Sequence, residues 1–298
     1  MTLHVVEPGL RSTVQDDPRT SHARSGLPGA GPADPHAFHA ARSLVGDGRA
    51  AVLEIVGLPF TFRCDDRRIV AVTGRDVSLR SVARVPGWTA VLLRAGQTAT
   101  VLGSTRYAYL AISGGIALEG VLGSRATYLA AGVGPLPRVL RAGDELPLGA
   151  ERGDIGRAGA RVPSPSYEGV VSAVVGPHEK RLPHAAVRAF FAEEFTVSAS
   201  ADRMGVRLEG PALAWEGSDV LSCGVVPGAV QVPRGGAPIV LGPDAQTTGG
   251  YPVIAVVAST ALGRVAQALP GERLRFTVVT ADRAAADLRA VGAAFAVI

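Results

Sequence analysis

The chain has 298 residues, of which 47% are hydrophobic, 19% charged and 5% aromatic, and its formal net charge is +4. This much apolar material excludes a disordered chain, while 37 glycines and 21 prolines exclude a helical bundle or a coiled coil. The composition therefore predicts a turn-rich, mostly β protein of one large or two ordinary domains.

One helix and four strands are predicted in the first half of the chain. Asp34 is a good N-cap and Pro35 a good first residue, so a helix is expected from Pro35 until Gly46 ends it. Short apolar or alternating runs bounded by turn residues then predict strands at 69–73, 90–94, 98–102 and 107–112. Many short strands at close spacing are typical of a β-barrel or a β-sandwich.

The second half is predicted to hold five strands and three helices, after a long connection at 149–169 that lacks periodicity. The strands are expected at 169–175, 229–232, 238–241, 253–257 and 273–279. The helices are expected from Pro183 to Glu193, from a Ser259 cap to Gln267, and from a Thr280 cap to about Val291. The connection divides the chain into an expected β subdomain at 1–160 and a second one at 161–298.

Several classes of protein are disfavoured by what the sequence lacks. The arginines are spread evenly among acidic residues, which argues against nucleic-acid binding. Cys64 and Cys223 cannot build a disulfide framework or a zinc site, and His36 with His39 is expected to be a partly exposed pair, so no metal site is predicted. No phosphate-binding loop is found. The longest apolar stretches are shorter than the roughly 20 residues of a membrane span, and no secretory signal is visible, so a cytoplasmic protein is expected.

Three polar segments flanked by glycine or proline are candidates for binding. Gln15 and Asp16 end the segment 13–16, where an amide and a carboxylate could bind a ligand or simply precede a turn. The loop 26–34 before the first helix is either an anion seat at the helix N-terminus or a plain loop with a capping Asp, and the residues favour the plain loop. In 200–205, Arg203 either pairs with a substrate carboxylate or belongs to a surface turn.

A fourth segment, at 244–252 between two apolar runs, carries the strongest signal. Gly249 and Gly250 are typical of a hairpin turn. A structural turn does not need the Asp, Gln, Thr and Tyr side chains that surround this pair. Those side chains can hold a planar amide or carbonyl substrate, with glycine N–H groups near an anion. The segment is therefore predicted to be functional rather than only structural.

Taken together, these segments resemble the KipA-like, biotin-dependent carboxyltransferase-domain family, also labelled allophanate hydrolase subunit 2 or the C subunit of 5-oxoprolinase. No single motif is decisive, but the ordered set is highly specific and covers nearly the whole chain. The motifs are PGLRSTVQD (8–16), GLPGAGPAD (26–34), ARSLVGD (41–47), AVTG (71–74), SGGI (113–116), LGSRATY (122–128), RAGDELPLG (141–149), SADRMGVRLEGP (200–211), SCGVVPGAVQVP (222–233), PIVLGPDAQTTGGYPVIA (238–255) and LPGERLRF (269–276).

The resemblance implies a cyclophilin-like β-barrel architecture, expected here as two β subdomains with a few short helices. It also implies a subunit of a heteromeric, ATP-dependent amide hydrolase of the 5-oxoprolinase type, which opens the lactam of 5-oxoproline to glutamate. ATP would be used by the complex as a whole. The implied partner is a KipI-like protein, also labelled allophanate hydrolase subunit 1 (PxpB-like), and a third, PxpA-like subunit joins in 5-oxoprolinase systems.

Two other functions stay open under the same resemblance. One is a carboxyltransferase that moves a carboxyl group from carboxybiotin to urea or a similar amide. Lys180 is the only lysine and no Met-Lys-Met site exists, so no biotin is expected to be attached covalently to this chain. The other is a non-catalytic regulator that binds a KipI-like kinase inhibitor.

The resemblance also implies roles for individual residues, with no histidine or glutamate standing out as the acid or base. The catalytic residues are expected to be Asp244, Gln246, Thr247 and Thr248, which would line the pocket and polarise the amide. The substrate-binding residues are expected to be Gln15, Asp16, Arg203, Gln231, Gly249, Gly250 and Tyr251. The chain departs from the family pattern before Gln246, where Pro243-Asp244-Ala245 lacks the usual arginine.

Overall fold

The structure, a computed structural model, describes residues 1–151, 155–215 and 220–296. The chain divides into two compact units. The N-terminal unit contains Met1–Arg19 and Ala30–Pro165 together with the C-terminal end of the chain, and the C-terminal unit contains Thr20–Gly29 and Ser166–Ala293. This boundary lies a few residues after the one that the sequence predicts at residue 160.

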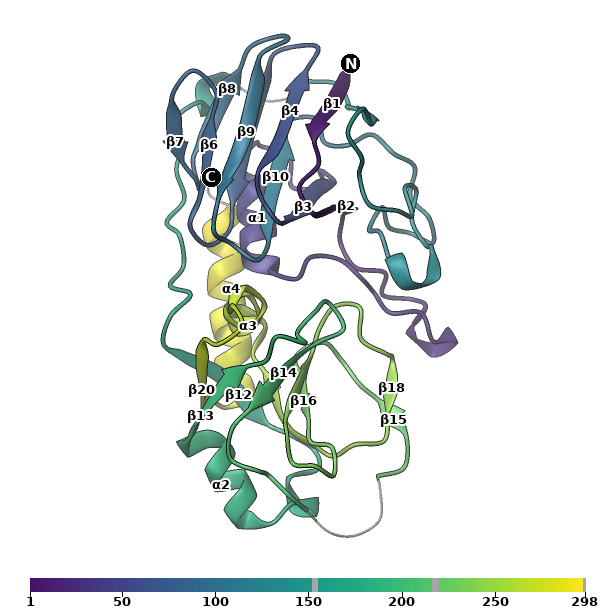
Figure 1. Cartoon of the computed structure of the whole chain (residues 1–298), viewed down its shortest axis with the longest axis vertical. Helices are drawn as coiled ribbons and strands as arrows, with labels where there is room; N and C mark the ends of the chain where they lie inside the picture. Colours follow the sequence, from purple (N-terminus) through teal and green to yellow (C-terminus); the bar gives the residue numbers. More distant parts are fainter. Residues whose placement is uncertain (152–154, 216–219, 297–298) are drawn as a thin grey trace. The chain divides into compact units, whose positions relative to one another are not determined.

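Two antiparallel sheets form the N-terminal unit (Figure 1). The six-stranded sheet has the order β11 (Glu145–Pro147), β1 (Thr2–Glu7), β4 (Phe60–Cys64), β9 (Thr98–Gly103), β6 (Val77–Arg80) and β7 (Arg84–Pro86). The five-stranded sheet has the order β2 (Arg11–Gln15), β3 (Val52–Val56), β10 (Ala108–Ile112), β5 (Arg68–Thr73) and β8 (Ala90–Leu93). One hydrophobic core, including Phe60, Phe62, Leu53, Val72 and Leu110, is shared by both sheets.

The burial pattern of the strands follows from what covers each face. In β4, Phe60, Phe62 and Cys64 are buried and alternate with the half-buried Thr61 and Arg63, as expected for a sheet with only one covered face. Strands β5 and β10 are buried along their whole length because α1 (Pro35–Leu44) packs on the other face of their sheet. That second face is where Glu54 and Tyr109 lie beside each other in register.

The C-terminal unit is a closed seven-stranded barrel (Figure 1). Its order is β12 (Val170–Val175), β19 (Val253–Val257), β16 (Ala229–Gln231), β17 (Ile239–Leu241), β14 (Gly205–Glu209), β13 (Glu194–Val197) and β20 (Arg273–Val278). Strands β12 and β20 are parallel and close the barrel. A separate two-stranded ladder is formed by β15 (Cys223–Gly224) and β18 (Thr248–Gly249). The mostly-β prediction with a β-barrel is therefore confirmed.

The four predicted helices are all present, with corrections at their ends. The helix α1 has Asp34 as its N-cap, and α2 (His184–Ala192) packs on the barrel, where Phe190 stacks on Phe276 with ring centroids 4.6 Å apart. The predicted Ser259 cap is wrong, because a 3₁₀ turn begins there and leads into α3 (Leu262–Gln267). The Thr280 cap is present, because Thr280 Oγ1 accepts from the backbone N–H of Arg283. The helix that it begins, α4 (Ala281–Ala296), extends beyond the predicted end.

The remaining segments are short turns or irregular connections. The 3₁₀ helices are η1 (Ala23–Ser25), η2 (Leu129–Ala131), η3 (Ile155–Arg157), η4 (Glu179–Arg181) and η5 (Ser259–Ala261). Residues 152–154 of the predicted connection lie outside the described residues, and its described part contains η3 and a single bridge between Thr89 and Arg161. Among the described residues, no helix is long and apolar enough to cross a membrane.

Candidate functional site

The segment 244–252 lies in the C-terminal unit, and it does not form the hairpin turn that is the structural alternative for its glycine pair. Thr248 and Gly249 are in strand β18, and Gly249 is directly opposite Cys223 of β15. The glycine pair is therefore not the tip of a turn, and the hairpin interpretation is wrong. Neither Gly249 nor Gly250 has a positive φ, so space rather than backbone conformation distinguishes these glycines from other residues.

Arg203 and Asp244 form a nearly buried ion pair. The Nε and Nη2 atoms of Arg203 donate to the two carboxylate oxygens of Asp244, each at 2.8 Å. Both residues are less than a tenth exposed. Such a two-point pair fixes both side chains. The fork of Arg203 therefore holds Asp244, which joins two segments that are 41 residues apart in the sequence.

Gln231 and Gln246 bring two amide groups together beside Gly249. Gln246 Nε2 donates to Gln231 Oε1 at 3.4 Å, at the long end of the hydrogen-bond range. Gln231 is 1% exposed, and its Nε2 has no hydrogen-bond acceptor among the described residues. A Cβ atom placed on Gly249 would stand 2.4 Å from that same nitrogen. The unpartnered amide nitrogen therefore faces the backbone of Gly249.

The other predicted residues of this segment lie at its surface. Gln246 and Thr248 are exposed, Thr247 is half-buried, and Tyr251 is 43% exposed. The carbonyl oxygen of Thr247 accepts from the N–H of Val225, which aligns the segment with the residues after β15. The segment thus places the exposed Gln246 amide against the buried Gln231 amide and leaves the Thr248 and Tyr251 side chains at the surface.

Gln15 and Asp16 belong to the N-terminal unit, where Asp16 is engaged by two arginines. Arg42 Nη2 donates to Asp16 Oδ1 at 2.6 Å, and Arg125 Nε donates to Oδ2 at 2.6 Å. Arg42 also reaches Asp17 at 2.8 Å, and its guanidinium carbon lies 4.0 Å from the ring centre of Phe38. Burial alone would raise the pKa of Asp16, but the hydrogen bonds and charge of Arg125 outweigh it and lower that pKa.

Gln15 carries the second unpartnered amide atom among the predicted residues. Its side chain is fully buried, and Nε2 donates to Thr13 Oγ1 at 3.0 Å and to the carbonyl oxygen of Thr127 at 3.1 Å. Its Oε1 has no donor among the described residues. Buried polar atoms without partners are few in folded proteins, so this oxygen is available to a donor that enters the site.

The N-terminus of α1 is filled by acidic side chains of the chain itself. Asp34 accepts from the N–H of Ala37 at 3.1 Å, and Glu54 Oε2 accepts from the N–H of Ala33 at 2.9 Å. Tyr109 Oη donates to Glu54 at 2.8 Å and accepts from the N–H of Asp34 at 2.8 Å. These bonds use the donors that an anion would need, so the loop with a capping Asp is confirmed.

His36 and His39 also lie on α1. Burial is the largest effect on both, and it lowers the pKa of each imidazole below its ordinary value. In the described ranges, no group of three or more His, Cys, Asp or Glu side chains is placed to hold a metal ion.

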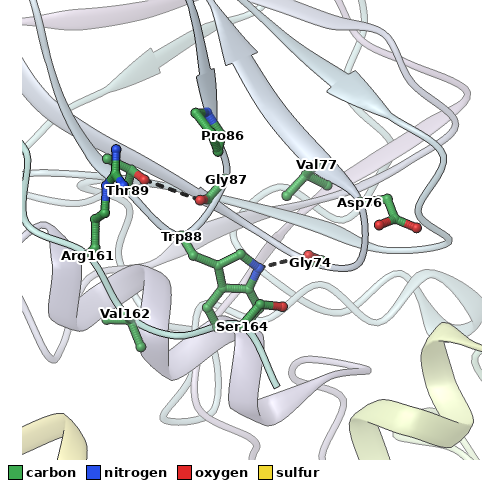
Figure 2. Close-up of a pocket in the computed structure, with 10 residues that line it drawn as sticks. All are labelled: Gly74, Asp76, Val77, Pro86, Gly87, Trp88, Thr89, Arg161, Val162 and Ser164. Carbon is green, nitrogen blue, oxygen red and sulfur yellow. Dashed lines mark hydrogen bonds between the residues drawn. The ribbon is translucent and has the colours of Figure 1, made fainter. Parts of the chain in front are cut away.

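A cavity of about 320 Å³ lies in the N-terminal unit, and none of the predicted site residues is among the ten that line it (Figure 2). The Trp88 ring lies at its centre, with Arg161 on one side and Asp76 on the other. The indole N–H of Trp88 donates to the carbonyl oxygen of Gly74 at 2.9 Å, and the Trp88 backbone has φ +59°. A bulky residue in this left-handed region is rare. Gly74 ends the AVTG motif, which was the only sequence signal at this cavity.

Sequence reasoning did not assign roles to several residues that organise these sites. They are Arg42, Glu54, Tyr109 and Arg125. Arg42 and Arg125 stand in ARSLVGD and LGSRATY, so the motifs contained the signal. Their pairing with Asp16 joins positions up to 109 residues apart, which no local pattern reveals.

Comparisons with known proteins agree with this architecture. The family model described as carboxyltransferase domain, subdomain A and B, matches residues 25–278. The C subunit of 5-oxoprolinase from Escherichia coli is 35% identical over 289 residues, which cover 95% of this chain and 93% of that protein. Urea amidolyase of Saccharomyces cerevisiae is 29% identical over 303 residues, which cover 92% of this chain but 16% of that protein.

Among solved structures, Kluyveromyces lactis urea carboxylase matches with a TM-score of 0.88 at 25% identity. The match covers 99% of this chain and 29% of that chain. This chain therefore corresponds to only a part of the urea enzymes, whereas it spans nearly the whole of the 5-oxoprolinase subunit. The match to the family model and the relative of similar length lead to the same conclusion: the chain belongs to the carboxyltransferase-domain family, subdomains A and B.

Proposed function

We propose that this chain is one subunit of a multi-subunit, ATP-dependent enzyme of the 5-oxoprolinase type that hydrolyses an amide. The observation that carries the proposal is the contact of the exposed Gln246 amide with the buried Gln231 amide beside Gly249, in a chain that matches the C subunit of 5-oxoprolinase over nearly its full length. A planar amide has one acceptor and one or two donors, and glutamine side chains have the same groups in the same plane. The pair is thus chemically matched to an amide substrate.

In this proposal, the residues of this chain bind and orient the amide. Gln231 offers a donor to the substrate, while Arg203 holds Asp244 so that the segment 244–248 keeps its place. Polarising the carbonyl by fixed donors in a water-poor site is an effective way to activate it. ATP belongs to the complex, and carboxybiotin, if it takes part, comes on another protein because the only lysine here is Lys180.

The partners are proposed to be a KipI-like subunit 1 and a third, PxpA-like subunit, in the cytoplasm. The relative from Escherichia coli, which is named as one subunit of 5-oxoprolinase, supports the need for other subunits. The test is reconstitution of the complex with 5-oxoproline and ATP, followed by measurement of glutamate and phosphate release. The proposal predicts glutamate release that requires this chain and falls at least tenfold with Gln246→Ala.

A second candidate is transfer of a carboxyl group from carboxybiotin to urea or a similar amide. The structural match to urea carboxylase favours it. The same reconstitution, supplied with carboxybiotin and urea in place of ATP and 5-oxoproline, distinguishes the two reactions. If the complex assembles but releases no product from either substrate pair, both enzyme proposals are refuted and a regulatory role gains support.

A further inference from the structure

We infer that the cavity beside Trp88 is a binding site for a small zwitterion, a free amino acid or a dipeptide, whose carboxylate pairs with Arg161 and whose ammonium group pairs with Asp76 (Figure 2). None of its ten lining residues takes part in the proposed function. The inference therefore goes beyond that function, and it is tested in the chain alone.

The cavity has the size and the lining of a site for a small polar molecule. Its volume of about 320 Å³ equals that of roughly ten water molecules, at about 30 Å³ each in the liquid. This volume is at the lower end of the range for ligand pockets. The apolar side chains of Val77, Pro86 and Val162 line it together with polar ones. A molecule the size of an amino acid or a dipeptide therefore suits the cavity.

Two groups of opposite charge lie on opposite sides of the Trp88 ring (Figure 2). The Arg161 side chain is exposed and has no hydrogen-bond or ion-pair partner within the described ranges, so its planar fork can take a carboxylate. Asp76 Oδ2 is 3.8 Å from Arg75 Nε, too far for a hydrogen bond, so its carboxylate can take an ammonium group. This arrangement is complementary to a molecule that carries both charges.

Trp88 lies between the two charged groups and is fixed by three hydrogen bonds. Its indole N–H donates to the carbonyl oxygen of Gly74 at 2.9 Å, and its backbone N–H to that of Val72 at 2.7 Å. Its own carbonyl oxygen accepts from the N–H of Val162 at 3.1 Å. Trp88 at φ +59° and Asp76 at φ +50° are two of the four non-glycine residues with positive φ in the described chain. Such residues cluster at binding and catalytic sites, and here two line one cavity.

The connection after the N-terminal sheet forms one wall of the cavity. Gly159 N–H donates to the carbonyl oxygen of Ala90 in β8 at 2.8 Å, and Ala90 N–H donates to that of Ala160 at 2.9 Å. The bridge between Thr89 and Arg161 continues this pairing. The backbone on both sides of the Arg161 side chain is therefore held, so the guanidinium group starts from a fixed position at the cavity.

The first experiment titrates the ¹⁵N-labelled full chain with alanine and with alanyl-alanine, and follows the indole N–H signals of its two tryptophans by NMR. Trp215→Phe assigns the Trp88 signal, which is expected to shift saturably while the Trp215 signal stays in place. The ligand that binds more tightly distinguishes an amino-acid site from a dipeptide site. N-acetylalanine and alaninamide, which each keep one charge, should bind about five- to tenfold more weakly than alanine.

Two outcomes of this titration overturn the inference. One is a Trp88 signal that does not move up to about 10 mM of either zwitterion, a concentration at which a millimolar Kd would give near saturation. The other is binding of N-acetylalanine or alaninamide as tight as that of alanine, because the ligand would then not need both charges.

The second experiment repeats the titration with Arg161→Gln and Asp76→Asn, which should each weaken binding about five- to tenfold. Asn tolerates the left-handed backbone as Asp does, so Asp76→Asn keeps the local conformation. Arg94→Gln is the matched control for Arg161→Gln, because Arg94 is also exposed but does not line the cavity. It should bind as the wild type does. Equal weakening by Arg161→Gln and Arg94→Gln would overturn the direct contact with Arg161.

Discussion

Tyr109→Phe removes one oxygen atom from the buried network that fixes the start of α1. In the wild type, the phenol donates to Glu54 and accepts from the N–H of Asp34, both at 2.8 Å, and Tyr109 is fully buried. The variant loses both hydrogen bonds of the phenol, at a cost of about 1–2 kcal/mol each, while Glu54 keeps its bond from Ala33. The expected loss of unfolding free energy is about 2–4 kcal/mol.

Urea denaturation followed by circular dichroism measures this loss, which corresponds to a fall in Tm of about 5–10 °C. Tyr128→Phe is the matched control, because the structure shows no hydrogen bond from the half-buried Tyr128 side chain within its described residues, and it should change stability by less than about 0.5 kcal/mol. The double variant with Glu54→Gln should be less destabilised than the sum of the single variants. Equal stability of Tyr109→Phe and Tyr128→Phe would refute the reasoning.

The remaining predictions concern pH, thiol reactivity and the buried ion pairs. Burial, followed by the charge of Glu54, raises the pKa of Tyr109 well above its ordinary value, so wild type should lose stability above about pH 10 while Tyr109→Phe does not, as urea titrations would show. Asp16→Asn should lower the free energy of unfolding by about 3 kcal/mol at neutral pH, because the guanidinium groups of Arg42 and Arg125 lose their counter-charge. Since the Asp16 pKa is lowered, that difference should shrink as the pH falls below 3.8. Burial raises the pKa of Cys64 to about 12, so maleimide labelling and peptide mapping at about pH 8 should find only Cys223 modified in the native protein. Arg203→Lys should lower the free energy of unfolding by about 1.5 kcal/mol in the same urea assay, because an ammonium group cannot form the two-point bond to Asp244.

The sequence predicted the apolar strands and the helices, and missed strands that carry polar residues. Runs such as 69–73 and 253–257 are continuous and apolar, so their burial on both faces could be recognised. Strand β4, with the sequence FTFRC, alternates apolar with polar residues over only five positions and was not predicted. The Gly249-Gly250 pair is typical of hairpins, which left a structural turn open as an alternative, whereas in the structure Gly249 lies in strand β18 and leaves space for Gln231.

The residues of the candidate sites were predicted better than the hydrogen bonds and ion pairs between them. The motifs identified Asp16, Arg203 and Asp244 as polar residues worth attention, but their side-chain partners were not predictable. Asp16 pairs with Arg42 and Arg125, and Arg203 pairs with Asp244, each through contacts between distant parts of the chain. A tertiary ion pair of this kind is set by the strand order, which local patterns do not contain.

The parallel pairing of β12 with β20 has a consequence for synthesis of the protein on the ribosome. Val170 lies opposite Arg275, so the first and last strands of the barrel are about a hundred residues apart and meet only when the cylinder closes. Until then, the growing chain can form only an open sheet, in which the edge of β12 that pairs with β20 has no partner strand. The nascent barrel therefore stays vulnerable to misassembly until β20 is available to pair with β12.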